Sequence, residues 1–85
     1  MAWNVLIVKS AEKQIRKMPA ADAERVRKAL LQMRKDPFAG DIVYLKGEQG
    51  VLRRRVGNWR ILFEILTKQQ TIVIQAVLRR TSKTY

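Results

Sequence analysis

The chain contains no cysteine and no histidine among its 85 residues. Without cysteine, disulfides and thiol chemistry are excluded. Without histidine, the commonest general acid–base side chain is missing, and a ribonuclease mechanism built on a pair of histidines is impossible. A zinc site is not expected without either residue, and the scattered carboxylates show no calcium-loop or paired-acid spacing. We therefore expect no cofactor and no metal.

Acidic residues are scarce, with 7 aspartates and glutamates against 18 lysines and arginines. The formal net charge is +11 and the pI is about 11.0. Such an excess favours an acidic partner, which can be nucleic acid, an anionic membrane surface or an acidic protein. It carries no information about the fold.

The chain also lacks a long apolar run, since no stretch approaches the roughly eighteen residues of a membrane span. The first residues, 1–8, show neither a basic leader nor a cleavage signal, so we expect a cytoplasmic protein without a membrane partner. Apolar residues make up 47% of the chain, which is enough for a packed core. A length of 85 residues leaves room for one domain, spanning 1–85.

The first segment, Trp3 to Val8, is rich in large and β-branched apolar residues, which predicts a strand. Because both of its faces are apolar, we place this strand inside a sheet. A short helix is predicted from Ala11 to about Met18. Ser10 would be its N-cap, and Pro19 would end it or open the next helix.

A second helix is predicted from about Ala20 to Lys35. Its apolar stripe repeats at the spacing of a helix face and consists of Val26, Ala29, Leu30 and Met33. Asp36 and Pro37 should end the helix, because a residue before proline avoids the helical conformation.

Extended segments dominate the remainder of the chain. We predict a short one over Ile42–Lys46, a turn over Gly47–Gly50, a hairpin that reaches about Thr67, and a last strand over Thr71–Leu78. The predicted fold class is α+β: an N-terminal strand, a two-helix hairpin and an antiparallel β-meander, with the helices packed on one face of a small sheet.

The hairpin is the stretch around which the site is predicted. Gly57-Asn58 suits a two-residue type II′ turn, which places Val56 opposite Trp59 and Arg55 opposite Arg60. Because side chains alternate between the two faces of a strand, each face can be listed. One face carries Leu52, Val56, Trp59, Ile61, Phe63 and Ile65, and the other carries Arg53, Arg55, Arg60, Leu62 and Glu64.

Two arginines directly opposite each other repel, at a cost of up to roughly 1 kcal/mol. A sheet that binds a polyanion has a reason to place them there, because guanidinium groups bind phosphate through two hydrogen bonds. The simpler interpretation is a solvated basic face on which Arg53 pairs diagonally with Glu64. The same register turns Arg54 toward the helices, where it must reach solvent or find a partner.

The C-terminal segment adds further cations and an aromatic ring to this face. Arg80 could complete the arginine cluster, Arg79 and Lys83 could contact the RNA backbone, and Tyr85 could stack on a base or transfer a proton. RNA cleavage without a metal requires stabilisation of the charge that develops on the phosphate. Arginine stabilises that negative charge but is a poor base, so the base remains open among Tyr85, Glu64, Lys46 and Glu48. Lys46 is equally suited to binding backbone phosphate.

Several segments, taken in order, resemble the RelE/ParE superfamily of type II toxins over essentially the whole chain. They are residues 10–19, Asp36-Pro37, Leu45-Lys46-Gly47, residues 53–65 with the pattern Arg-x-Arg-Val-Gly-Asn-Trp-Arg, and Leu78-Arg79-Arg80. The resemblance implies two helices on an antiparallel sheet, and an antitoxin whose helices and strands wrap the toxin. RelE-like members cleave mRNA at the ribosomal A site.

Carried over by position, Arg53, Arg55, Arg60 and Arg80 match the family's basic catalytic set, and Tyr85 matches its C-terminal tyrosine. We predict that Arg55, Arg60, Arg80 and Tyr85 are catalytic. We predict that Arg53 positions the RNA backbone, and that Lys46, Arg79 and Lys83 also bind RNA. Arg53 and Arg55 stand where some members have lysines, and the spacing to Tyr85 varies within the family. Two other functions remain open: a ParE-like inhibitor of DNA gyrase without ribonuclease activity, and a basic nucleic-acid-binding module. The +11 charge favours an antitoxin whose binding segment is acidic.

Overall fold

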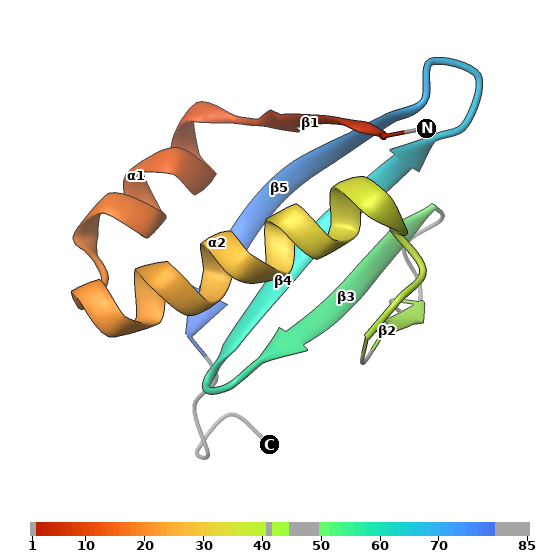
Figure 1. The fold of residues 1–85 in the computed structure, drawn as a ribbon. Helices are drawn as coiled ribbons and strands as arrows, with labels where there is room; N and C mark the ends of the chain where they lie inside the picture. Colours follow the sequence, from red (N-terminus) through yellow and green to blue (C-terminus); the bar gives the residue numbers. More distant parts are fainter. Residues whose placement is uncertain (1, 41, 45–49, 80–85) are drawn as a thin grey trace.

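A computed structural model describes residues 2–40, 42–44 and 50–79. The elements follow the order β1 (Asn4–Ile7), α1 (Lys9–Lys17), α2 (Ala20–Lys35), β2 (Ile42–Tyr44), β3 (Val51–Val56), β4 (Trp59–Leu66) and β5 (Thr71–Arg79) (Figure 1). This order confirms the predicted α+β class. Neither helix in the described part of the chain has both the length and the apolar character that crossing a membrane requires.

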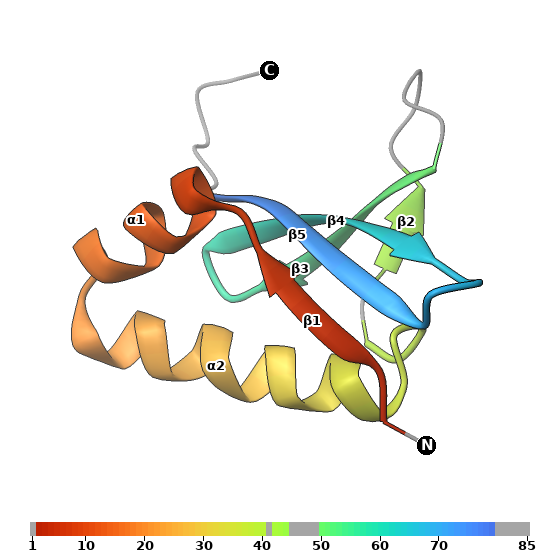
Figure 2. The same cartoon turned by 90° about the horizontal axis from the view of Figure 1, so that it is seen from above.

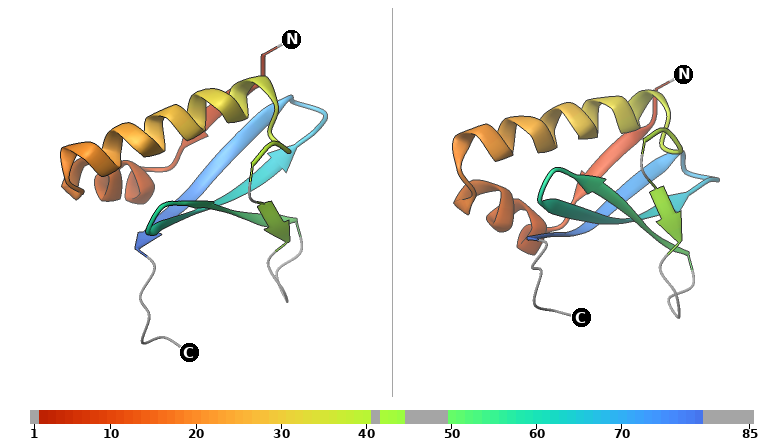
Figure 3. Two further views of the ribbon diagram at one scale, coloured as in Figure 1. Left: turned by 60° about the horizontal axis from the view of Figure 1, so that its bottom comes forward. Right: turned by 90° about the horizontal axis from the view of Figure 1, so that it is seen from below.

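The five strands form one mixed sheet in the spatial order β1-β5-β4-β3-β2. β1 pairs in parallel with β5, and the other neighbours are antiparallel. Figure 2 shows α2 lying along one face of this sheet, with α1 beside the end of β5. The opposite face is not covered by either helix, and we call it the open face (Figure 3).

The core lies between α2 and the sheet. The predicted stripe of α2 is confirmed, since Val26, Ala29, Leu30 and Met33 are buried. They pack against side chains from one face of the strands, chiefly Leu52, Ile61, Phe63, Ile72, Ile74 and Val77. Full burial of one large aliphatic or aromatic side chain stabilises the fold by about 1.5–3 kcal/mol.

β1 is an edge strand, so the prediction that it lies inside the sheet was wrong. Val5 and Ile7 pack against the core, whereas Leu6 points to the open face with 55% of its surface exposed. Both faces of β1 are apolar, but only one of them is covered. The helical face is covered by α2, and the other is an exposed apolar surface at the sheet edge.

The first helix begins at Lys9, two residues before the predicted start, and Val8 rather than Ser10 is its N-cap. The N–H of Val8 still donates to Ile74 O of β5 at 3.1 Å, while its carbonyl accepts from Glu12 N at 3.0 Å. One residue thus ends the strand ladder and starts the helix. Ser10 lies inside the first turn, where it does not cap the helix.

The end of α2 is as predicted. Asp36 N donates to Gln32 O at 2.9 Å, and the Asp36 carboxylate accepts from Phe38 N at 3.0 Å. The side chain thus closes a turn directly after the helix, which is the usual role of aspartate before a loop.

Candidate functional site

The β3–β4 hairpin has the predicted register. Val56 pairs with Trp59, Arg55 with Arg60, and Arg53 with Leu62. Gly57 has a φ of 57°, the left-handed conformation that the first position of a type II′ turn requires. The turn therefore fixes which side chains reach the open face.

Arg55 and Arg60 form a directly opposed pair on the open face. In a two-residue hairpin the pair that closes the turn exchanges hydrogen bonds, so the next pair does not. Such non-hydrogen-bonded pairs have Cβ atoms only about 4.5–5.5 Å apart. Arg55 is exposed and Arg60 is half-buried, and each makes a further interaction within the chain. The backbone thus holds the first side-chain atoms of two arginines side by side.

Apolar side chains border this pair. Leu78 of β5 lies across from Arg60 on the side away from Arg55, and Leu62 lies between Arg53 and Ala76 in the neighbouring row. Val43 of β2 flanks Arg53 from the other side. The arginines therefore stand on a surface that is partly apolar, which suits a ligand with both charged and flat apolar parts.

Glu64 does not neutralise Arg53. Ion pairs within the described ranges join residues of a single helix: Glu12 with Arg16, Asp22 with Arg25, and Glu24 with Arg27. The simpler interpretation of the basic face, with an Arg53–Glu64 pair, is thus not what the structure shows.

Arg54 points to the opposite side of β3, as the register predicts, and is only 7% exposed. Its guanidinium donates to Ala29 O at 3.3 Å and to Gln32 Oε1 at 2.6 Å, both on α2. Burial lowers the pKa of Arg54, because removal from water disfavours the charged form. Arg54 therefore fastens the arginine-bearing strand to α2, through hydrogen bonds to two uncharged oxygens.

Gly40 lies against the Arg54 guanidinium. A Cβ at this position would come within 2.8 Å of Arg54 Cζ, and the φ of Gly40 is +95°. Both facts require glycine here. The sequence alone did not indicate this contact.

We expect Gly40→Ala to lower the free energy of unfolding by about 2 kcal/mol, from backbone strain and displacement of Arg54. Urea denaturation measures the loss. Gly50→Ala is the matched control. Gly50 also has a positive φ (+78°), but the atom nearest to its added Cβ would be Glu64 Oε2, at 3.9 Å. Equal losses for the two variants would contradict a specific contact between residue 40 and Arg54.

The remaining predicted site residues are only partly placed. Lys46, Glu48, Arg80, Lys83 and Tyr85 lie outside the described residues, and their roles stay predictions. Arg79 ends β5 opposite Trp59, which puts it on the helical face rather than with Arg60. The structure therefore brings together Arg53, Arg55 and Arg60, and separates Arg79 from them.

The face of Arg79 is set by a β-bulge. Leu62 pairs with Ala76 but Phe63 pairs with Ile74, so Gln75 is an extra residue in β5. After it, Val77 is buried and Leu78 faces the open side. Gln14 of α1 accepts from Val77 N at 2.7 Å, which links the helix to this part of β5.

An arginine pair on the open face of a five-stranded sheet, with two helices on the other side, defines a small basic α+β protein suited to an anionic ligand. Comparison with known families identifies it further. The profile of the family described as ParE toxin of type II toxin-antitoxin system, parDE, matches residues 5–83. The chain belongs to this family, and is a type II toxin of the RelE/ParE superfamily.

Relatives and solved structures agree with this assignment. The chain is 28% identical over 83 residues to RelE1 of Methanocaldococcus jannaschii, covering 94% of this chain and 92% of the relative. It is also 26% identical to a chain in the crystal structure of the RelB-RelE antitoxin-toxin complex from Methanococcus jannaschii. That comparison covers 87% of this chain and 88% of the other, with a TM-score of 0.74. The archaeal RelE-RelB complex from Pyrococcus horikoshii has a TM-score of 0.84 at 23% identity, over 96% and 99% of the chains, and supports the fold.

Proposed function

We propose that this toxin is a metal-independent endoribonuclease that cleaves mRNA at the ribosomal A site and so inhibits translation. The observation that carries the proposal is the opposed pair Arg55–Arg60 on the open face, with Arg53 beside it on β3. A ribonuclease needs positive charge at the scissile phosphate, and an inhibitor that binds a protein does not require two directly opposed arginines.

The proposed reaction uses the RNA's own nucleophile. The 2′-oxygen loses its proton and attacks the adjacent phosphorus, the bond from phosphorus to the 5′-oxygen breaks, and the 5′-oxygen takes up a proton. Negative charge grows on the non-bridging oxygens as the bond forms, and preorganised cations lower the barrier by stabilising it. Arg55 and Arg60 are assigned this role, since guanidinium groups bind phosphate oxygens in pairs.

The other residues are assigned to binding and proton transfer. Arg53 positions the RNA backbone, one row away from the arginine pair. Arg80 joins the charge-stabilising set, and Tyr85 stacks on the substrate or acts as base. Lys46 and Lys83 are assigned to phosphates outside the cleaved bond. Arg79 lies on the helical face and is assigned to a more distant part of the RNA backbone. Removal of any of the three should weaken binding more than the chemical step.

An antitoxin is the proposed protein partner. The solved complexes from Pyrococcus horikoshii and Methanococcus jannaschii contain RelE bound to RelB. The +11 charge of this chain favours an antitoxin with an acidic binding segment, whose association would be fast and sensitive to salt.

The second candidate function is inhibition of DNA gyrase. The description of the matching family as a ParE toxin favours it. The same fold serves either activity, so the fold does not decide between them.

The purified chain tests both candidates side by side. We expect the toxin to cut mRNA that is bound to programmed ribosomes. The buffer contains a chelator that removes free divalent ions, at a concentration that leaves the ribosome intact. We expect no effect on gyrase supercoiling at the same concentration. Inhibition of gyrase with intact mRNA would overturn the nuclease and favour the second function.

A further inference from the structure

A pocket of about 340 Å³ lies where β4 begins and β5 ends, beside the last turn of α1. This volume falls within the range of roughly 300–1,000 Å³ that is usual for small-ligand sites. Trp59, Val77 and Arg79 line the pocket from the helical side of the sheet, whereas Leu78, which also lines it, lies on the open face across from Arg60. The pocket therefore extends around the end of β5 and borders the arginine face.

The edge of β5 is uncovered at this pocket. β1 pairs with β5 only as far as Ile74, and α1 lies beside the rest of the strand (Figure 2). Val77 N donates to Gln14 Oε1 of α1 at 2.7 Å, so the backbone of Val77 points away from β4. Arg79, two residues further along, points its N–H and C=O to the same side. Within the described residues these two groups have no hydrogen-bond partner.

An aromatic ring and a guanidinium group share the helical face at this end of the sheet. Trp59 and Arg79 are directly opposite each other on β4 and β5. Trp59 exchanges its backbone hydrogen bonds with Val56 across the hairpin turn, so its pair with Arg79 is not hydrogen-bonded. Cβ atoms in such a pair are only about 4.5–5.5 Å apart. Trp59 is half-buried and packs against the core, which fixes one aromatic wall of the pocket.

Positive charge lies at the rim of the pocket. Lys17 of α1 and Arg79 are both exposed, and neither forms an ion pair with a described residue. The described residues that line the pocket include no carboxylate. The pocket thus combines an aromatic wall, an uncovered backbone donor beside an acceptor, and two cations.

We propose that this pocket binds one unpaired nucleotide of single-stranded RNA. The base lies against Trp59, and its Watson–Crick edge, which places donors beside acceptors, bonds the N–H and C=O of Arg79. The side chains of Lys17 and Arg79 bind the adjacent phosphates. An acidic peptide would use the cations but has no need of the aromatic wall, and a paired base has no free edge to offer.

The position of the pocket indicates which RNA reaches it. Neighbouring strands are about 4.8 Å apart, so an RNA strand held at Arg60 passes over Leu78 and continues around the end of β5. A nucleotide of the cleaved mRNA, outside the cleaved bond, is therefore the expected occupant, and ribosomal RNA offers the same chemistry. The source of the RNA rests on the proposed function, whereas affinity of the pocket for free RNA does not.

The first test measures binding of a short single-stranded oligoadenylate to the full chain by fluorescence anisotropy. We expect Trp59→Leu to weaken binding at least fivefold, because stacking on an aromatic side chain is lost. Trp59→Phe should lose less than twofold, since it also shortens the side chain but keeps an aromatic ring. Equal losses in the two variants would overturn the proposal.

A second pair of variants tests the cations without touching the core. Lys17→Glu should weaken binding at least fivefold. Lys13→Glu is the matched control, because it makes the same charge change on an exposed residue one turn earlier in α1 that does not line the pocket. It should lose less than twofold, and equal losses at the two positions would contradict a local site.

Amide exchange followed by NMR reports the contact with the backbone directly. Saturating oligoadenylate should slow exchange at Arg79 at least tenfold and leave Leu78 unchanged, because the N–H of Leu78 already bonds Arg60 in the ladder. Absent binding, or binding with unchanged exchange at Arg79, would overturn the pocket. Failed mRNA cleavage with these binding results intact would overturn the proposed nuclease alone.

Abasic nucleotides distinguish the two sources of RNA. They are placed singly along an mRNA on programmed ribosomes, where they remove a base and keep every phosphate. A position near the cleaved bond at which KM rises for the natural chain but not for Trp59→Leu identifies mRNA as the occupant. No such position, together with weaker ribosome binding by Trp59→Leu, identifies ribosomal RNA.

Discussion

Replacing Arg60 by alanine should lower the rate of mRNA cleavage by about 10²–10³-fold. This is the loss that follows removal of one preorganised donor from a developing negative charge. Arg60 lies between Arg55 and Leu78 on the open face of the sheet. Single-turnover cleavage of ribosome-bound mRNA measures the change in the chemical step separately from binding.

Two further variants show whether the loss of cleavage rate comes from the charge and geometry of Arg60. Arg60→Lys keeps the charge but not the planar pair of donors, and should recover only part of the rate. Arg16→Ala removes an exposed arginine of α1 that forms an ion pair with Glu12, and should change the rate less than twofold. Unchanged cleavage by a folded Arg60→Ala protein would contradict the assignment of Arg60.

Replacing Arg54 by alanine should lower the free energy of unfolding by about 2–4 kcal/mol, the largest stability loss we expect from a single site. The substitution leaves a cavity between β3 and α2 and removes two hydrogen bonds. Arg54→Met should lose less than about 1 kcal/mol. Methionine fills most of the volume and removes a buried charge whose two hydrogen bonds go to uncharged oxygens.

Urea denaturation of the two Arg54 variants separates packing from hydrogen bonding. Ala29 lies inside α2 and keeps its intrahelical hydrogen bond, so the loss of Arg54 leaves no carbonyl unsatisfied there. A methionine variant as unstable as the alanine variant would contradict this account and give the hydrogen bonds the dominant role.

The hairpin was predictable because its register depends on two adjacent residues. Gly57-Asn58 fixes the turn, and strict alternation then assigns every side chain of β3 and β4 to a face. The burial of Arg54 and the placement of Arg53, Arg55 and Arg60 follow from that assignment. The partners of Arg54 did not follow, because Gln32 and Gly40 lie on other segments of the chain.

Other features depend on contacts between distant parts of the chain, which a local sequence pattern does not indicate. The position of β1 at the edge is set by its pairing with β5, some seventy residues along the chain. The early start of α1 at Lys9 follows from the same pairing through Val8. The bulge at Gln75 reverses the alternation of β5, so the face of Arg79 could not be read from its sequence position.

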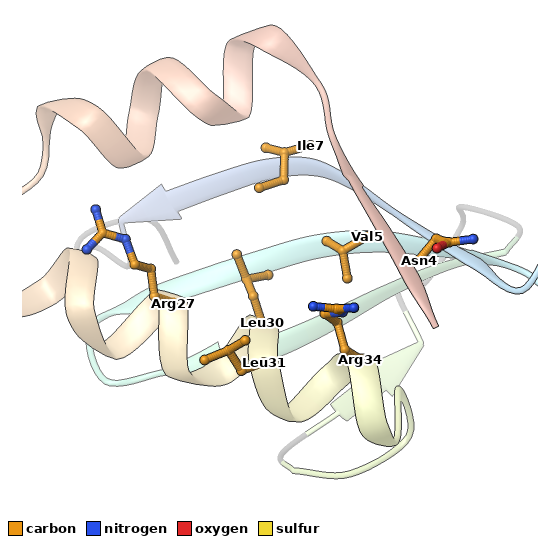
Figure 4. Close-up of a pocket in the computed structure, with 7 residues that line it drawn as sticks. All are labelled: Asn4, Val5, Ile7, Arg27, Leu30, Leu31 and Arg34. Carbon is orange, nitrogen blue, oxygen red and sulfur yellow. The ribbon is translucent and has the colours of Figure 1, made fainter. Parts of the chain in front are cut away.

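A groove between β1 and α2 was also missed from the sequence (Figure 4). Arg27 and Arg34 line it, and it exists only because β1 packs alongside α2. Leu31 was the available signal, since it is an apolar residue outside the predicted stripe and directly follows Leu30. An exposed leucine next to a core position indicates a second contact surface on one helix.

The most direct test of the central claim is to induce the chain in cells and map the 5′ ends of mRNA across translated frames. The account predicts growth arrest with new 5′ ends inside codons, in phase with the reading frame, and loss of both with Arg60→Ala. Growth arrest with intact mRNA, or cleavage that persists in a folded Arg60→Ala variant, would contradict it.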